Sequence, residues 1–295
     1  MNNKSVIMRG MSRDGSARIT VINSREIVER AIEHHKTAPT ATAALGRLLT
    51  AASMIGSMLG GKDDSVTLSM RGDGEGGHII AVSDYYGNVR GYIEHPLADP
   101  PRRSDGHLNV AAVVGRGSLY VMKDIEGMAN SQNGTVGIVS GEIAEDIAAY
   151  FAQSEQIPTL CALGVLVAAN GTCKSAGGIL VQLLPFADEN TVTRIEENSK
   201  KLSSVSSLFD SGLSVDEVAD IAFDGIPYDK FDERKVDFLC TCSRARMKEG
   251  ILRLGKPEIK KMFDEQEAQG LKRSLTAICR FCNTSYTFDE KDFSL

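Results

Sequence analysis

The sequence predicts an α+β fold in three parts: a large mixed α/β body over residues 1–187, a helical linker over residues 188–239, and a small C-terminal domain over residues 240–295. Three observations support this division. Short strand-like segments dominate the body, and helices interrupt them without a regular βαβ rhythm. Residues 188–238 hold 13 acidic and 6 basic side chains. Residues 240–295 are mildly basic, with 11 basic and 8 acidic side chains, and they contain two close pairs of cysteines.

The predicted strands of the body are rich in β-branched residues and are bounded by glycine, aspartate or asparagine. A hairpin is predicted around Asn170-Gly171, because this dipeptide is a strong two-residue turn signal between apolar runs. The other predicted strands cover residues 17–22, 65–70, 78–83, 88–94, 118–123 and 135–140.

Two amphipathic helices are predicted between these strands. The first begins near Asn23, which forms an N-x-x-E start with Glu26. The second follows Ser140 and ends before Pro158, because proline cannot continue a helix. Their apolar stripes fall at helical spacing: Ile27, Ala31 and Ile32 in the first, and Ile143, Ile147 and Phe151 in the second.

Residues 40–60 are nearly uncharged and about as long as a membrane span. Arg47 lies inside this stretch, and serine and threonine are scattered through it. These features favour a buried core helix over a membrane helix. The N-terminus lacks the apolar run of a signal peptide. We therefore expect no membrane association and no export.

The linker is predicted to contain short helices. Val192, Ile195, Leu202, Val205 and Phe209 fall at helical spacing. A further helix follows Ser214, which forms a capping box with Glu217. Helices of this length are marginal alone, so the linker is expected to be metastable and to need a surface to pack against.

The C-terminal domain is too small to rely on a single apolar core, so disulfide bonds or a bound metal ion are expected to stabilise it. Cys240-x-Cys242 and Cys279-x-x-Cys282 could surround one tetrahedral ion, and Zn²⁺ suits four thiolates. Between the pairs we expect one helix capped by Ser243 and a second after Gly255 and Pro257. A terminal strand is expected to carry Tyr286 and Phe288.

Other interpretations of the cysteines are weaker. The chain has five histidines and none follows His107, so a mixed Cys/His site in this domain is excluded. Four sulfurs leave no open position for catalysis. A thioredoxin-type couple would start a helix, whereas turn and strand residues follow Cys282. Two unrelated structural cysteine pairs remain the alternative. Cys161 and Cys173 are expected to be buried free thiols.

Several further motifs suggest functions that their context argues against. Gly72, Gly74 and Gly77 match G-x-G-x-x-G, but a strand follows them and Asp73 and Glu75 would repel phosphate, so a β-turn is predicted. His34 and His35 are expected to be helix-end residues. No concentrated basic surface suggests nucleic-acid binding. No nucleophile or acid–base constellation suggests an enzyme, so no catalytic residue is assigned.

With both cysteine pairs in place, the chain resembles the 33 kDa chaperonin family, the redox-regulated holdase chaperones of the heat shock protein 33 type. The resemblance covers nearly the whole chain. It rests on "FLCTCSRARMKEGILRLGKPEI" and "CRFCNTSYTF", and in the body on "TAPTATAALGRLLTA", "LSMRGDGEGG", "GNVRGYIEHP", "SGEIAEDIAAYFAQSEQIP" and "SAGGILVQLLP". The stretch from 265 to 278 makes the spacer between the pairs somewhat longer than is usual, which bears on the kinetics of oxidation.

The resemblance implies a cytoplasmic, ATP-independent chaperone whose reduced form binds one Zn²⁺ through the four cysteines and is inactive. Oxidation would form disulfides Cys240–Cys242 and Cys279–Cys282, release the ion and unfold the tail and the linker. Exposed surface would then bind unfolding client proteins, and the body would carry client binding and dimerisation, with a homodimer as the oxidised form. The main alternative is a zinc-ribbon module that binds nucleic acid or protein constitutively. A second alternative is an enzyme that uses the glycine-rich body.

Overall fold

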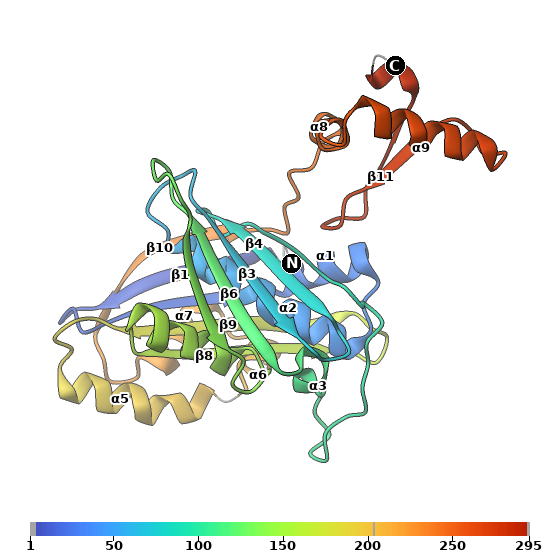
Figure 1. The fold of residues 1–295 in the computed structure, drawn as a ribbon. Helices are drawn as coiled ribbons and strands as arrows, with labels where there is room; N and C mark the ends of the chain where they lie inside the picture. The colour runs from blue at the N-terminus through green and yellow to red at the C-terminus, as the bar shows by residue number, and fades with distance from the viewer. Residues whose placement is uncertain (1–3, 203, 294–295) are drawn as a thin grey trace. The chain divides into compact units, whose positions relative to one another are not determined.

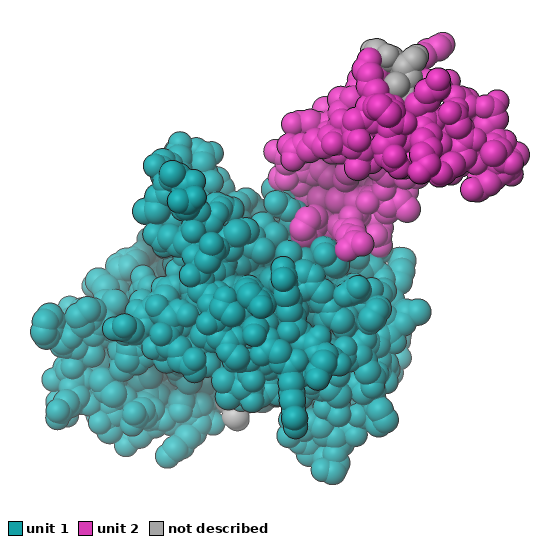
Figure 2. All heavy atoms as spheres, in the orientation of Figure 1, with its two compact units in different colours: residues 1–239 teal, residues 240–295 magenta. Residues whose placement is uncertain are grey.

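The computed structural model describes residues 4–202 and 204–293. The chain divides into two compact units, residues 1–239 and residues 240–295 (Figure 2). The body and the linker of the sequence analysis therefore belong to one unit, and the cysteine-rich tail forms the other.

The first unit contains a five-stranded antiparallel sheet, sheet A, with strand order β10-β1-β2-β9-β8. Its strands are β1 Ser5–Ser12, β2 Ala17–Asn23, β8 Thr159–Val167, β9 Cys173–Leu183 and β10 Tyr228–Val236. The predicted hairpin is confirmed as β8 and β9. Its loop spans residues 168–172, with a register shift between Leu166 and Val167, and is longer than the predicted two-residue turn.

A second five-stranded antiparallel sheet, sheet B, has the order β5-β4-β3-β6-β7. Its strands are β3 Ser65–Gly72, β4 His78–Asp84, β5 Val89–Ile93, β6 Gly117–Asp124 and β7 Gln132–Gly137. The prediction of a strand over 135–140 is wrong at its C-terminal end. The amides of Val139 and Ser140 donate to Oδ1 of Asp146, so these residues form the loop before the next helix.

Helix α2, Pro39–Ser57, packs against strands of both sheets (Figure 1). Almost all of its residues are buried, which its alanine, serine, threonine and glycine content permits because small side chains let both sheets approach closely. Arg47, its one charged residue, forms an ion pair with Glu142. The core-helix prediction is confirmed, and no helix among residues 4–202 and 204–293 is long and apolar enough to cross a membrane.

The remaining helices of the body are α1 Arg25–His35, α3 Val110–Val114 and α4 Ala144–Tyr150, the last continued by a π-helical turn over Phe151–Glu155. Both predicted amphipathic helices are present. The first begins after Ser24, and the Asn23 side chain accepts a hydrogen bond from the Arg25 amide. His35 is buried at its end and hydrogen-bonds to the Gly91 carbonyl, as expected for a helix-end residue.

The linker folds onto sheet A. Its helical elements are α5 Glu189–Ser199, a 3₁₀ turn Lys200–Leu202, α6 Val205–Asp210 and α7 Val215–Ala222. The predicted capping box between Ser214 and Glu217 is present. The helical prediction is wrong for the C-terminal part, because β10 is a strand there. The exposed side chains of β10 are charged except for Phe231, which suits an edge strand paired with β1.

Sheet A therefore has two buried faces. Alternate residues of its strands point toward α2 or toward the linker helices. The linker-facing cluster joins sheet residues Met8, Ala17, Ile19, Val21, Ile179 and Val181 to linker residues Ile195, Leu202, Val205, Phe209, Val215, Val218, Ala219, Ala222, Phe223 and Ile226. The linker was expected to need a surface to pack against, and sheet A of the body provides that surface.

The second unit contains α8 Arg244–Leu252, α9 Lys256–Ala268, β11 Leu275–Ile278, β12 Ser285–Phe288 and a 3₁₀ turn Glu290–Phe293. The Ser243 hydroxyl accepts from the Arg246 amide, which confirms the predicted helix cap. Pro257 lies in the first turn of α9, as predicted. The small core of this unit consists of Ile259, Phe263, Leu275, Phe288 and Phe293.

Candidate metal centre

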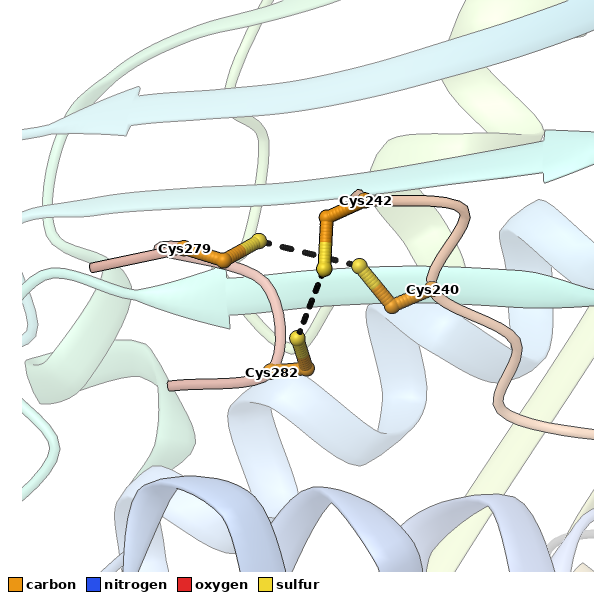
Figure 3. A group of neighbouring side chains, drawn as sticks. All are labelled: Cys240, Cys242, Cys279 and Cys282. Carbon is orange, nitrogen blue, oxygen red and sulfur yellow. Dashed lines mark hydrogen bonds between the residues drawn. The ribbon is translucent and has the colours of Figure 1, made fainter. Parts of the chain in front are cut away.

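The four cysteines of the second unit come from two loops. Cys240 and Cys242 lie in the segment that precedes α8, and Cys279 and Cys282 lie in the turn that joins β11 to β12. All four Sγ atoms lie within 4.8 Å of one another (Figure 3). Two cysteine pairs with 36 residues between them are thus brought to one point by the α8–α9 pair and the short hairpin.

The spacing of the sulfurs fits a tetrahedral ion. The Sγ atoms of Cys240 and Cys279 are 3.7 Å apart, and those of Cys242 and Cys282 are 3.4 Å apart. Four sulfurs at about 2.3 Å from one Zn²⁺ would be about 3.8 Å from each other. The donor set is all sulfur, which excludes hard ions such as Mg²⁺ and Ca²⁺ and favours zinc. The residues present therefore fit the zinc site that the sequence suggests.

The turn between β11 and β12 is held by its own backbone. The Cys279 amide donates to the Thr284 carbonyl at 3.0 Å, and the Asn283 amide donates to the Cys279 carbonyl at 2.8 Å. Asn283 adopts a left-handed conformation with φ of 54°, which asparagine tolerates better than most residues. This tight turn directs the thiols of Cys279 and Cys282 to the same side.

Two polar side chains contact the sulfurs. The Tyr286 hydroxyl lies 3.1 Å from Sγ of Cys242, and the Thr284 hydroxyl lies 3.2 Å from Sγ of Cys282. When the sulfurs are thiolates, both hydroxyls act as donors. Tyr286 was predicted only as a strand residue, and neither contact was predicted. The spacing of two between Tyr286 in β12 and Thr284 just before it is the signal that could have revealed them.

The protein environment resists ionising all four thiols together. Desolvation and hydrogen bonding to neighbouring cysteines raise the pKa of Cys240, and desolvation raises that of Cys279. Desolvation also acts on Cys282, but hydrogen bonds from Thr284, Cys242 and Cys240 together outweigh it and lower the pKa to about 7. Raised pKa values at Cys240 and Cys279 oppose ionisation there, so bringing four thiolates together requires a compensating cation.

The two remaining cysteines lie in the first unit and are free thiols. Cys173 is buried at the start of β9, and desolvation raises its pKa to about 12. Cys161 lies on β8, and desolvation likewise raises its pKa. Thiolates are the reactive form, so both are unreactive near neutral pH. The prediction of a buried free thiol is confirmed for Cys173 and is wrong for Cys161, which is half-buried.

The glycine-rich loop of residues 71–78 joins β3 to β4, as predicted, and no helix begins there. A β-carbon on Gly72 would lie 1.8 Å from the Val114 carbonyl oxygen. One on Gly74 would lie 2.5 Å from the Gly115 amide nitrogen. These glycines therefore allow close backbone packing between the turn and the α3–β6 segment, which explains the motif without a nucleotide.

The fold and this site define a class of protein: a mixed α/β body of two antiparallel sheets with a separate small unit that presents four cysteines to one metal ion. The family model described as "Hsp33 protein" matches residues 5–289. The chain belongs to the Hsp33 family, which the motifs of the sequence analysis suggested.

Individual relatives agree with this assignment. The chain is 39% identical to the 33 kDa chaperonin of Clostridioides difficile over 290 residues, which cover 98% of this chain and 97% of that protein. It is 40% identical to the 33 kDa chaperonin of Desulforamulus reducens over 288 residues, covering 97% and 95%. The crystal structure of the 33 kDa chaperonin of Thermotoga maritima superposes with a TM-score of 0.89 at 33% identity, covering 99% and 97%.

Proposed function

We propose that this protein is a cytoplasmic, redox-regulated, ATP-independent holdase chaperone. In its reduced form, Cys240, Cys242, Cys279 and Cys282 hold one Zn²⁺ and the chaperone is inactive. Oxidation converts it to a form that binds unfolding proteins and prevents their aggregation. The observation that carries the proposal is the convergence of four sulfurs within 4.8 Å in a unit whose own core is small.

When bound, Zn²⁺ would supply the positive charge that keeps the four sulfurs deprotonated and close together. The cysteines would hold it, and the Tyr286 and Thr284 hydroxyls would orient two of the sulfurs. A structural zinc site contributes about 10–16 kcal/mol to folding a small module. Among residues 240–293, the core has five buried apolar side chains besides Cys279, so folding of this unit depends on that contribution.

Oxidation removes the ligands. For each disulfide, two thiolates lose two electrons to one hydrogen peroxide, which takes up two protons from solvent and becomes two water molecules. The cysteines of one motif join: Cys240 with Cys242, and Cys279 with Cys282. A disulfide sulfur is a poor ligand, so the four side chains release the ion. The tail then loses the bound metal that stabilises its fold.

The pairing within each motif is supported by loop-closure entropy. The shortest sulfur contacts run between the motifs, from Cys240 to Cys279 and from Cys242 to Cys282 (Figure 3). In a tetrahedral cluster, however, every sulfur is about equally near the other three, so proximity selects no partner. Once one ligand detaches, its sequence neighbour remains tethered a few residues away and has the highest local concentration.

Unfolding of the tail would reach the linker through the chain itself. Cys240 directly follows Leu239, whose amide donates to the Val89 carbonyl, and Phe238, whose side chain is buried beside His34. These residues continue from β10, an edge strand with charged side chains. If Phe238 and Leu239 lost these contacts, β10 would be held less firmly. The short linker helices would then also lose support, without which they are marginal.

Release of the linker would expose apolar surface on the linker and on sheet A. The linker would present Ile195, Phe209 and Phe223, and sheet A would present Ile19, Val21 and Ile179, all of them buried while the linker is docked. Contiguous apolar surface of this kind binds unfolding chains. By resemblance to the family, the oxidised form would also be a homodimer.

The experiment couples two measurements. Zinc release by peroxide is followed with a chromogenic chelator while the same sample is tested for suppression of the aggregation of a thermally unfolded model enzyme. The proposal requires that suppression be weak in the reduced, zinc-loaded protein and rise with zinc release. Suppression that is the same before and after zinc release would show that there is no redox switch.

A further inference from the structure

The two edges of sheet A differ in chemistry. The edge strand β10 carries charged residues along its length, which discourages pairing with another chain. The edge strand at the other side, β8, has the sequence TLCALGVLV and carries no charge. An apolar edge strand without charged or proline residues is a template for addition of a further strand.

The register shows which backbone groups of β8 face outward. The Leu183 amide donates to the Pro158 carbonyl, so this pair is a hydrogen-bonded one, and hydrogen-bonded pairs alternate with non-bonded pairs along an antiparallel ladder. Cys161, Leu163 and Val165 therefore direct their amides and carbonyls away from β9. None of the turn, loop or cap hydrogen bonds within residues 4–202 and 204–293 uses these groups.

A cavity of about 330 Å³ lies along the C-terminal half of this edge. Residues 163–167 of β8 form one side of it, and Ala43 and Arg47 of α2 and residues of the 102–108 loop form others. Its charged lining residues among those the structure describes are Arg47 and Arg102. Arg47 is paired with Glu142, although its Nε is enclosed without a hydrogen-bond partner. Arg102 donates to the Gly106 carbonyl and has no carboxylate partner among the described residues, so it is the positive charge that a negatively charged ligand would meet.

The linker forms the remaining wall. Ser204–Ser207, at the start of α6, line the same cavity. Gly164 of β8 permits this approach, because a β-carbon there would lie 2.6 Å from the Ser206 amide nitrogen. The Ser175 hydroxyl of β9 donates to the Ser206 carbonyl. Undocking of α6 would remove this wall and open the edge strand.

We propose that the outer edge of β8 is a binding site for an extended segment of an unfolding client, which adds to sheet A as a further strand. The client backbone pairs with the outward amides and carbonyls of Cys161, Leu163 and Val165. An acidic side chain of the segment lies toward Arg102. This inference rests on the proposed holdase function and assigns the site at which it acts. Docking of α6 narrows the site, so oxidation increases its affinity.

The test uses the full-length protein in its oxidised and reduced forms and a fluorescent peptide of alternating valine and threonine with one central aspartate. Binding is measured by fluorescence anisotropy. A twin peptide carries N-methyl groups on alternate amides, which removes one hydrogen-bonding edge and keeps the side chains. A second twin carries asparagine in place of aspartate. The oxidised protein should bind the parent peptide more tightly than the reduced protein does, and N-methylation should weaken binding roughly tenfold or more.

Two variants test the site in the protein. Leu163→Pro removes an outward amide that the β8–β9 ladder does not use, so the sheet can be retained while strand addition is blocked. Leu163→Val measures the share of the effect that comes from lost side-chain packing. Should Leu163→Pro fail to fold, Arg102→Glu at the exposed rim provides the second test. It should reduce binding of the aspartate peptide far more than binding of the asparagine twin.

Aggregation suppression by the same samples separates the two hypotheses. If the oxidised parent protein does not suppress aggregation, the proposed function itself fails. If it does, but N-methylation and the variants leave peptide binding unchanged, the function stands and the β8 site is wrong. If Leu163→Pro alters self-association and not peptide binding, a second copy of this chain occupies the edge, which also overturns the proposal.

Discussion

The ring of Phe209 occupies the space above the Gly177 backbone: a β-carbon on Gly177 would lie 2.1 Å from Cε2 of Phe209. Gly177 lies in β9 of sheet A, and Phe209 lies in α6 of the linker. The absence of a side chain at residue 177 thus creates the slot that holds the linker against the body.

Phe209→Ala should release the linker without oxidation. The side chain is 7% exposed, and truncating a buried phenylalanine costs about 3–5 kcal/mol. We expect faster proteolysis within residues 188–239 and appreciable aggregation suppression by the reduced, zinc-loaded variant. Phe231→Ala is the matched control, because Phe231 is also in the linker but 59% exposed. Equal proteolysis of the two variants would mean that the slot does not hold the linker.

The disulfides of the peroxide-treated protein should join Cys240 to Cys242 and Cys279 to Cys282. Peptide mapping by mass spectrometry after alkylation of free thiols identifies them directly. Cys161 and Cys173 should be recovered as alkylated thiols after unfolding, because desolvation keeps them protonated during oxidation. A majority of bridges between the motifs, such as Cys242 to Cys282, would contradict the loop-closure argument.

Tyr286→Phe should accelerate zinc release by peroxide. The substitution removes the hydroxyl 3.1 Å from Sγ of Cys242 but keeps the ring, so the fold of β12 should persist. Loss of a group that orients a ligand typically weakens a metal site about 10- to 100-fold. Release is timed with a chromogenic chelator, and Tyr86→Phe, on an exposed tyrosine of the first unit, is the control. Identical rates of zinc release from the parent and Tyr286→Phe proteins would show that the Tyr286 hydroxyl does not stabilise the metal site.

Asp14 should make the stability of the first unit pH-dependent, and its hydrogen bond from Thr191 extends this dependence to the linker. Hydrogen bonds from the Ser12 hydroxyl, the Ser16 amide and hydroxyl, and Thr191 of α5 hold the pKa of Asp14 well below its usual range. A carboxyl with a lowered pKa in the folded state stabilises the protein above its unfolded value of about 3.9 and loses this contribution as pH falls through the folded value.

Parent and Asp14→Asn proteins should therefore differ most in linker protection near neutral pH, and the difference should shrink as the pH falls below about 4. Urea unfolding at several pH values, with proteolysis of α5 as the readout, measures it. A difference that stays constant to the lowest accessible pH would show that the Asp14 charge does not contribute.

Local sequence rules predicted much of the fold because they depend on near neighbours. The buried character of α2, the capping box at Ser214 and the cap at Ser243 follow from residues only a few positions apart. The cysteine cluster was also predictable, because C-x-C and C-x-x-C are local motifs whose chemistry limits their use.

The features that the sequence did not predict depend on distant partners. Strand β10 is stabilised by pairing with β1, more than 200 residues away, and its nearly continuous run of charges resembles a solvated helix until that partner is known. The contact of Tyr286 with Cys242 and the slot between Gly177 and Phe209 likewise require the assembled fold. Such contacts give no local periodicity that a single sequence can display.

Hydrogen exchange of the linker, measured on the same sample before and after peroxide treatment, tests the central claim most directly. The account predicts that amides of α5, α6 and α7 lose protection together with zinc release, while amides of α2 and of β3, β4 and β6 in sheet B remain protected. Linker protection that is unchanged in an oxidised, zinc-free protein would contradict it, since the four cysteines would then control the fold of the tail alone.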